Sequence, residues 1–246
     1  MVRELSGAVV FDPGNVATNE KLWDVYATEW SAEASWVQNM AKQRQVLLLG
    51  DEWAPEAHTS RVVEEWILPH LTTESVVGEL GSGGGRVAAK VAGKCREFHC
   101  FDLSSKMLAK AKEVLGDKCC HYHHGDVAGV PPTSSLRDKF DFVYCFDVMV
   151  HMDTHTIYRC LHKIRGLLKK PGGRAFISTA NLAAPDGWAR FESQPRFSVA
   201  GFFFLTPETV RLLASKAGFS ILEDSSSPDP SNTYYNRDYL AILSLE

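Results

Sequence analysis

Residues 76–86 read VVGELGSGGGR and decide the fold of this chain. An apolar run of strand character contains one acidic residue, Glu79, and leads into a loop with glycines at 81, 83 and 85. Such glycines let the backbone turn sharply and let a ligand approach without a Cβ in the way, although a tight strand–helix turn alone would need them too. The spacing is neither the G-x-G-x-x-G of dinucleotide sites nor a P-loop. The stretch therefore predicts a buried strand, a turn suited to a ligand, and a helix.

Strand and helix patterns alternate from this stretch to the end of the chain. The predicted strands are 75–80, 97–102, 119–124, 140–146, 174–179, 219–223 and 239–245, and the predicted helices are 85–91, 105–115, 154–168 and 206–217. Alternation of this kind predicts a mostly parallel, doubly wound sheet with helices on both faces. Only the Ser/Pro-rich loop 224–232 separates the last two strands, which predicts an antiparallel hairpin at one edge.

Length, charge and cysteines bound the class of protein. A chain of 246 residues with 45% apolar residues predicts one globular domain, or one domain with an added cap, rather than two full domains. The net charge is −4, and residues 1–75 hold twelve acidic and only five basic residues, which disfavours nucleic acid as a partner. The six cysteines form no C-x-x-C pair, so we expect reduced thiols in a cytoplasmic protein without structural zinc. We expect no membrane segment and no secretory signal.

Polar residues close the predicted strands that follow the glycine loop. Asp102 ends the second strand, where a carboxylate can accept hydrogen bonds from both hydroxyls of a ribose. Asp126 follows the third strand, where it can accept from an adenine amino group. The fourth strand ends at Phe146-Asp147, and residues 167–173 lead into the fifth. Polar groups at successive strand ends fit a nucleoside ligand at a topological switch point.

In order and spacing, these motifs over residues 60–246 resemble those of the class I S-adenosylmethionine-dependent methyltransferases. The resemblance implies an α/β, Rossmann-like, doubly wound sheet of seven strands in the order 3-2-1-4-5-7-6, with an N-terminal helical cap. The domains would be 1–60, a cap over the acceptor site, and 61–246, the S-adenosylmethionine-binding core. S-adenosylmethionine would be the methyl donor and S-adenosylhomocysteine the product, and no metal is expected.

The resemblance also implies the residues that hold the donor. Gly81 and Gly83 would approach its methionine and ribose parts, and Phe146 would offer a backbone carbonyl to the ammonium. Glu79 either organises this region or is purely structural, and Met107 either packs on the adenine or belongs to the core stripe of its helix. The expected cofactor residues are Glu79, Gly81, Gly83, Arg86, Asp102, Leu103, Met107, Asp126, Val127 and Phe146.

Methyl transfer from a sulfonium needs alignment and exclusion of water more than acid–base groups. A hydroxyl or ammonium acceptor must still lose a proton, so a base near the methyl group would help. His151, four residues after Asp147, is the predicted base, and Asp147 would face the donor or the acceptor. The alternative is a packed or helix-capping histidine ahead of Asp153. The expected catalytic residues are His151 and Asp147.

The sequence offers two possible metal sites. Magnesium-assisted phenol methyltransferases resemble this chain at Asp147 and Asn181, but the Asp that they carry before that Asn is Ala180 here. Three histidines flank the third predicted strand, and alternation along a strand would split them between two faces: His121, His123 and His124. We therefore predict no metal ligands.

Aromatic side chains in the first 60 residues and near residue 204 are the candidates for the acceptor site. They are Trp23, Tyr26, Trp30, Trp53 and Phe204. With the acidic excess of this segment, they form either a lid that favours a cationic acceptor, or a helix docked by its aromatics with its charges in solvent. The first hypothesis is N- or O-methylation of a small molecule, an amine or a phenol. The alternatives are a methyltransferase of protein amino termini, on the likeness of residues 151–153, and a noncatalytic S-adenosylmethionine-binding module.

Overall fold

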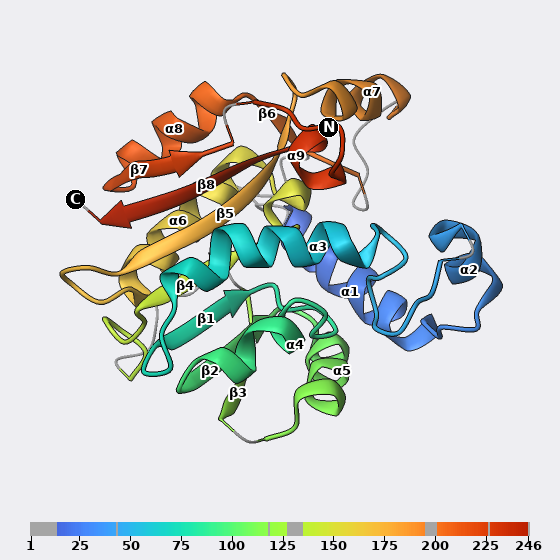
Figure 1. Ribbon diagram of the computed structural model, residues 1–246, viewed down its shortest axis with the longest axis horizontal. Coiled ribbons are helices and arrows are strands. Elements are labelled where there is room, and N and C mark those ends of the chain that lie inside the picture. The colour runs from blue at the N-terminus through green and yellow to red at the C-terminus, as the bar shows by residue number, and fades with distance from the viewer. Residues whose placement is uncertain are drawn as a thin grey trace, which may run out of the picture.

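The computed structural model describes residues 14–42, 44–117, 119–126, 135–194, 201–225 and 227–245, with side chains from Asn19 onward. Its strands form one sheet in the order β3-β2-β1-β4-β5-β8-β7, with β6 paired to β5 (Figure 1). The strands are β1 (Val76–Leu80), β2 (Glu97–Asp102), β3 (Cys120–His124), β4 (Phe142–Cys145), β5 (Arg174–Asn181), β6 (Phe204–Leu205), β7 (Phe219–Asp224) and β8 (Asp238–Leu245). Strand β8 runs antiparallel to both β5 and β7. This confirms the predicted order, because the two-residue strand β6 only shifts the numbering of the last two.

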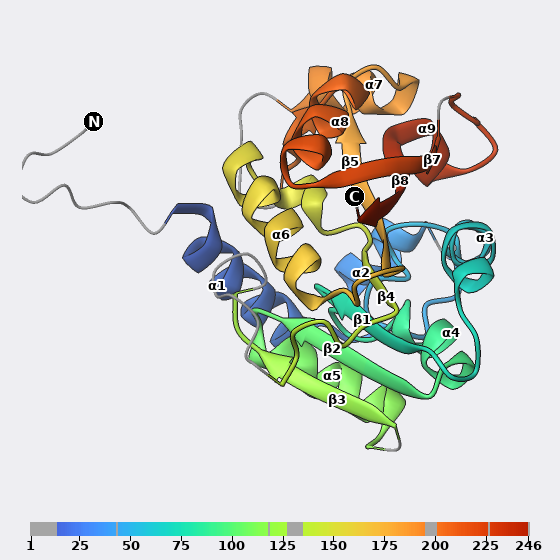
Figure 2. The same ribbon diagram turned by 90° about the vertical axis from the view of Figure 1, so that its left-hand side faces the viewer.

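Helices cover both faces of the sheet. They are α1 (Gly14–Glu29), α2 (Ser35–Ala41), α3 (Glu56–Val62), α4 (Ala88–Val91), α5 (Ser105–Leu115), α6 (Thr154–Leu167), α7 (Pro185–Ser193), α8 (Pro207–Lys216) and α9 (Thr233–Arg237). Shorter helical turns span Val63–Ile67, Leu68–His70, Ala92–Lys94 and Met149–His151. Helices α6 and α8 lie on one side of the sheet, and α3 and α4 on the other (Figure 2).

Two apolar cores follow from the alternation of side chains along the strands. In β2, Phe98 and Cys100 pack into the core below α3 and α4, and Phe101 packs into the core below α6 and α8. Side-chain caps begin two of the longer helices: Ser104 accepts from the amide of Met107, and Asp153 from that of Thr156.

Helix α9 corrects one expectation of the sequence. The last two strands are not joined by a loop alone, because α9 lies between β7 and β8. Its five residues are too short to show helical periodicity, and burial holds it in place. Tyr234 and Tyr235 are buried, and the Trp66 indole nitrogen donates to the Tyr235 hydroxyl at 2.6 Å. Helix α4 also begins three residues later than predicted, since Gly85 has a φ of 86° that no right-handed helix accepts.

The described residues contain no helix that is long and apolar enough to cross a membrane. The six cysteines are free thiols.

Candidate active site

A deep cavity lies at the carboxyl ends of β1, β2 and β4. The space between its walls, including the mouth, is about 1140 Å³. Every expected cofactor residue that the structure describes contributes to the wall, namely Glu79, Gly81, Gly83, Arg86, Asp102, Leu103, Met107, Asp126 and Phe146. Val127 lies outside the described residues.

The glycine loop needs its glycines for two different reasons. Gly81 has a φ of 75°, and a Cβ there would stand 2.5 Å from the Val148 side chain. Gly83 has a φ of 52°, and a Cβ there would meet nothing within 4 Å, so its backbone borders open space in the cavity. The first glycine therefore serves packing, and the second leaves room for a ligand.

Two buried carboxyl groups face this loop. Asp102 accepts from the backbone amides of Gly83 and Ser104, both at 2.8 Å, and burial raises its pKa to about 6 despite these hydrogen bonds. Burial also raises the pKa of Glu79 well above its usual range. Within the described part of the chain, Glu79 Oε2 accepts no hydrogen bond. The Tyr144 hydroxyl lies beside this carboxyl and partly offsets the effect of burial, and Oε2 can still accept a hydrogen bond from a bound ligand.

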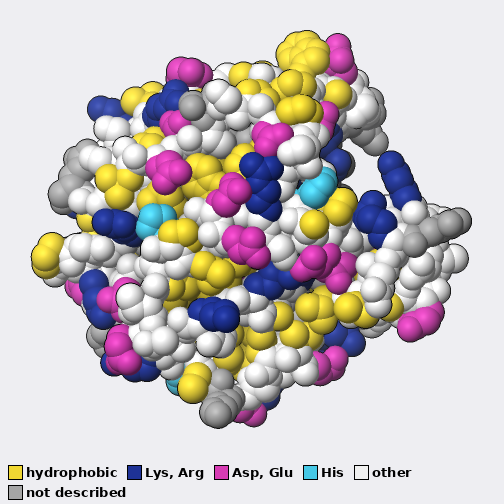
Figure 3. Space-filling model, in the orientation of Figure 1, with side chains coloured by type: hydrophobic (Ala, Val, Ile, Leu, Met, Phe, Trp, Pro, Cys, Tyr) yellow, Lys and Arg dark blue, Asp and Glu magenta, His cyan; other side chains and the backbone are white. Residues whose placement is uncertain are grey.

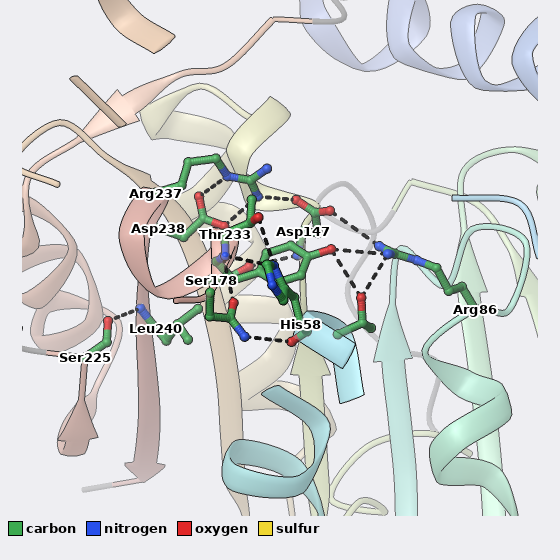
Figure 4. A network of polar contacts seen from close by, with 12 residues as sticks. His58, Arg86, Asp147, Ser178, Ser225, Thr233, Arg237, Asp238 and Leu240 are labelled. Carbon is green, nitrogen blue, oxygen red and sulfur yellow. Dashed lines mark hydrogen bonds and ion pairs between the residues drawn. The ribbon is translucent and has the colours of Figure 1, made fainter. Parts of the chain in front are cut away.

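Asp147 lies between two arginines at the end of β4 (Figure 4). Its carboxylate is 2.7 Å from Arg237 and 3.5 Å from Arg86, and Arg237 also binds Asp238 at 2.6 and 2.8 Å. Its backbone has a φ of 59°, held by a hydrogen bond from its amide to the Ser178 hydroxyl at 2.8 Å. Burial raises the pKa of Asp147, but the two guanidinium groups outweigh it and leave the pKa below its usual value. Asp147 is thus an ionised anchor for two arginines.

His151 lines the cavity beyond Asp147 and is 7% exposed. Its Nδ1 is 3.1 Å from the carbonyl oxygen of Gly201. A carbonyl only accepts, so Nδ1 carries the proton and Nε2 is the basic nitrogen of the neutral ring. Burial lowers the pKa of His151, although Asp147 favours the charged form. The ring therefore stays neutral at pH 7. It makes T-shaped contacts with the rings of Trp23 and Phe202.

The part of the cavity around His151 is aromatic. Trp23, Tyr26 and Trp53 line it as expected, and so does Phe202, which lies two residues before the expected Phe204. Trp30 and Phe204 lie outside this lining, although each was expected at the acceptor site. The indole nitrogen of Trp30 donates to Glu52 at 3.1 Å, and the Phe204 ring packs 6.1 Å from that of Phe202.

The acids of the N-terminal turn are used by the protein itself. Glu52 is buried and accepts hydrogen bonds from the Tyr26 hydroxyl and, at 3.0 Å, from the amide of Gly50. Asp51 accepts from the amides of Leu47 and Leu48. On the face drawn in Figure 3, acidic side chains are interspersed with basic ones. Asp51 and Glu52 therefore supply structural hydrogen bonds at this turn and do not line the cavity.

Comparisons with known proteins agree with this geometry. Residues 77–173 match the family model of a methyltransferase domain. The chain is 27% identical over 121 residues to a ubiquinone biosynthesis O-methyltransferase of Azoarcus sp. (strain BH72), covering 48% of this chain and 49% of that protein. A second ubiquinone biosynthesis O-methyltransferase, from Aeromonas salmonicida (strain A449), is 25% identical over 104 residues, 42% of each chain. The chain thus matches about half the length of these relatives or less.

Solved structures share the fold over nearly the whole chain. Magnesium protoporphyrin IX methyltransferase (ChlM) from Synechocystis PCC 6803, with bound S-adenosylhomocysteine, has a TM-score of 0.64 at 16% identity, covering 94% of this chain and 100% of that one. A DhpI complex with S-adenosylhomocysteine has a TM-score of 0.61 at 16% identity, covering 96% and 98%. The chain thus has the fold of the class I S-adenosylmethionine-dependent methyltransferases, and its residues 77–173 match a methyltransferase domain. S-adenosylmethionine is the methyl donor of that class.

Proposed function

We propose that the protein transfers a methyl group from S-adenosylmethionine to an oxygen or nitrogen of a small, largely apolar acceptor. The observation that carries the proposal is that one cavity joins the glycine loop and Asp102 to the neutral, buried His151. The donor part and a base of suitable protonation state thus border the same space. The relatives described above are named for ubiquinone biosynthesis and for magnesium protoporphyrin IX, which supports a small-molecule acceptor.

The residues present fit the donor. Each Asp102 oxygen already accepts one backbone hydrogen bond and keeps a second lone pair, so the two can accept from the two ribose hydroxyls. Glu79 Oε2 would accept from the methionine ammonium, and Arg86 would pair with its carboxylate. Met107 and Asp126 would contact the adenine. When bound, S-adenosylmethionine supplies an activated methyl group.

The chain's own residues would prepare the acceptor. Nε2 of His151 would take the proton of the attacking hydroxyl or amine, while the hydrogen bond from Nδ1 to Gly201 keeps the ring oriented. Trp23, Trp53 and Phe202 would hold the acceptor and exclude water. We retain residues 1–60 as the cap over this site, since α1 and the turn before Trp53 form one of its walls.

Methylation of a protein amino terminus is less well supported. The resemblance to such enzymes rests on residues 151–153. Asp153 is the N-cap of α6, where it accepts hydrogen bonds from the Thr156 amide and hydroxyl at 2.9 and 2.8 Å. We also propose that the protein is cytoplasmic, because its cysteines are free thiols.

A screen with isotope-labelled S-adenosylmethionine tests the proposal. The purified chain is incubated with phenols, amines and short peptides, and label is measured in each acceptor. We expect transfer to a phenol or an amine. Transfer to peptides alone would overturn the small-molecule assignment, and donor binding without transfer to any acceptor would favour the noncatalytic module.

A further inference from the structure

A second group of polar side chains lies on β2 and β3, outside the cavity. Glu97 and His99 are two residues apart on β2, and His121 and His123 are two apart on β3. The parallel register places His99 opposite His121. Because residues two apart share a face of a strand, all four side chains project from the same face of the sheet. The proposed methyl transfer uses none of them.

Three of these residues bring ligand atoms close together. Glu97 Oε1 is 2.9 Å from His99 Nε2 and 3.2 Å from His121 Nε2, and the three atoms all lie within 4.8 Å of one another. Ligand atoms about 2.1 Å from a tetrahedral Zn²⁺ are about 3.4 Å apart, close to the two spacings that Glu97 makes. The His121 side chain is 51% exposed, so its ring has room to rotate. Rotation can bring the third distance, between the Nε2 atoms of His99 and His121, to the same spacing.

We propose that Glu97, His99 and His121 bind a first-row transition metal ion, with Zn²⁺ as the best physiological fit. Two imidazoles and one carboxylate suit Zn²⁺, whereas Mg²⁺ and Ca²⁺ prefer oxygen ligands alone. Nε2 of His123 is 2.8 Å from Nδ1 of His99, so His123 would orient that ligand from outside, as second partners of metal-bound histidines do. Water would complete the coordination.

The hydrogen bonds of these side chains suit a metal. Nε2 of His99 and Nε2 of His121 both lie within 3.2 Å of Glu97 Oε1, and a metal ligand must offer such a nitrogen without its proton. On metal binding, His99 would move its proton from Nε2 to Nδ1, and His123 would do the same, so the charge of both rings is conserved.

Lys139 provides the sharpest test, because its ammonium contacts the same Glu97 oxygen at 2.5 Å. The Lys139 ammonium is a positive charge beside the proposed ligand Glu97, so it would compete with the metal ion for that carboxylate. The ion would tie the edge strand β3 to β2. These strands lead to Asp102 and Asp126, so the metal would stiffen the adenosine side of the cavity without touching it.

The experiment is a titration of the reduced full chain with Zn²⁺ and with Co²⁺. Binding is measured by calorimetry and, for Co²⁺, by its absorption spectrum. Glu97→Gln and His121→Ala should each weaken binding by about tenfold or more, and His123→Ala by about 10–100-fold. Lys139→Met should tighten binding by about tenfold, because it removes a competing charge. A gain of affinity cannot come from misfolding. His155→Ala, which removes an exposed histidine on α6, should bind as the unmodified chain does.

The cobalt spectrum distinguishes this site from the six thiols. We expect one Co²⁺ per chain, with tetrahedral d–d absorption and without thiolate-to-cobalt charge transfer. A thiolate band, an unchanged affinity in Glu97→Gln and His121→Ala, or no gain in Lys139→Met would each overturn the proposal. Because these readouts need neither donor nor acceptor, failure here leaves the proposed methyl transfer standing.

Discussion

At the scale of single residues, His151 carries the proposed proton transfer. His151→Ala should lower kcat by about 10²–10⁴-fold, the usual contribution of a general base. Donor affinity should change little, because the ring is bound to Gly201, Trp23 and Phe202 rather than to the glycine loop. The check is turnover together with donor calorimetry, and His155→Ala is the matched control. An unchanged kcat would remove His151 from the mechanism.

The same residue predicts the pH dependence of turnover. Burial lowers the pKa of His151 below its usual value of about 6.5. The base is active when neutral, so kcat should be constant at neutral pH and fall as the pH drops through that lowered value. A profile of kcat against pH measures this. The fall in kcat at low pH should be absent from the residual rate of His151→Ala. A midpoint clearly above 6.5 would contradict the account.

Arg237 does not line the cavity, but it binds Asp147, which does. Arg237→Met would leave Asp147 and Asp238 buried without this cation, which should cost about 3–5 kcal/mol of unfolding free energy. Lys170→Met removes an ion pair with Asp138 between side chains that are 54% and 55% exposed, and should cost less than about 1 kcal/mol. Urea denaturation compares the two variants. Equal losses would mean that the buried network contributes no more than a surface pair.

At the scale of elements, the turn between β1 and α4 depends on Gly81. Gly81→Ala puts a methyl group against Val148 at a φ of 75°, and should lower the free energy of unfolding by about 1–3 kcal/mol and weaken donor binding. Gly93→Ala is the control, since a Cβ there meets nothing within 4 Å. It should change stability by less than about 1 kcal/mol. Thermal unfolding of both variants checks this, and similar values would show that the turn tolerates a side chain.

Elements with a clear sequence period could be predicted, and shorter ones could not. The strand ends and Asp102 follow from local pattern. Helices α7 and α9 and strand β6 do not, because tertiary packing rather than their own period determines them. Arg237, which no sequence pattern indicated, ends α9. The position of Asp147 could be predicted, but not that two arginines hold it.

At the scale of the whole molecule, the cavity is shared between the core and the N-terminal segment. Strands β1, β2 and β4 supply the donor side, and α1 with the turn at residues 49–53 supplies part of the aromatic wall. The acids of the N-terminal segment also join parts of the molecule: Asp24 accepts from the Ser104 hydroxyl at 2.6 Å, and Glu65 binds Arg61 and Tyr235. These two acids therefore bind other parts of the protein rather than border the cavity.

Calorimetric titration of the full chain with S-adenosylmethionine tests the central claim most directly. The account predicts one site per chain, with an affinity that falls by about tenfold or more in Asp102→Ala, because two ribose hydrogen bonds are lost. Asp117→Ala, which removes a carboxylate that is 72% exposed, should leave the affinity unchanged. Absence of binding by the unmodified chain, or equal affinity in Asp102→Ala, would contradict the assignment of this cavity to the methyl donor.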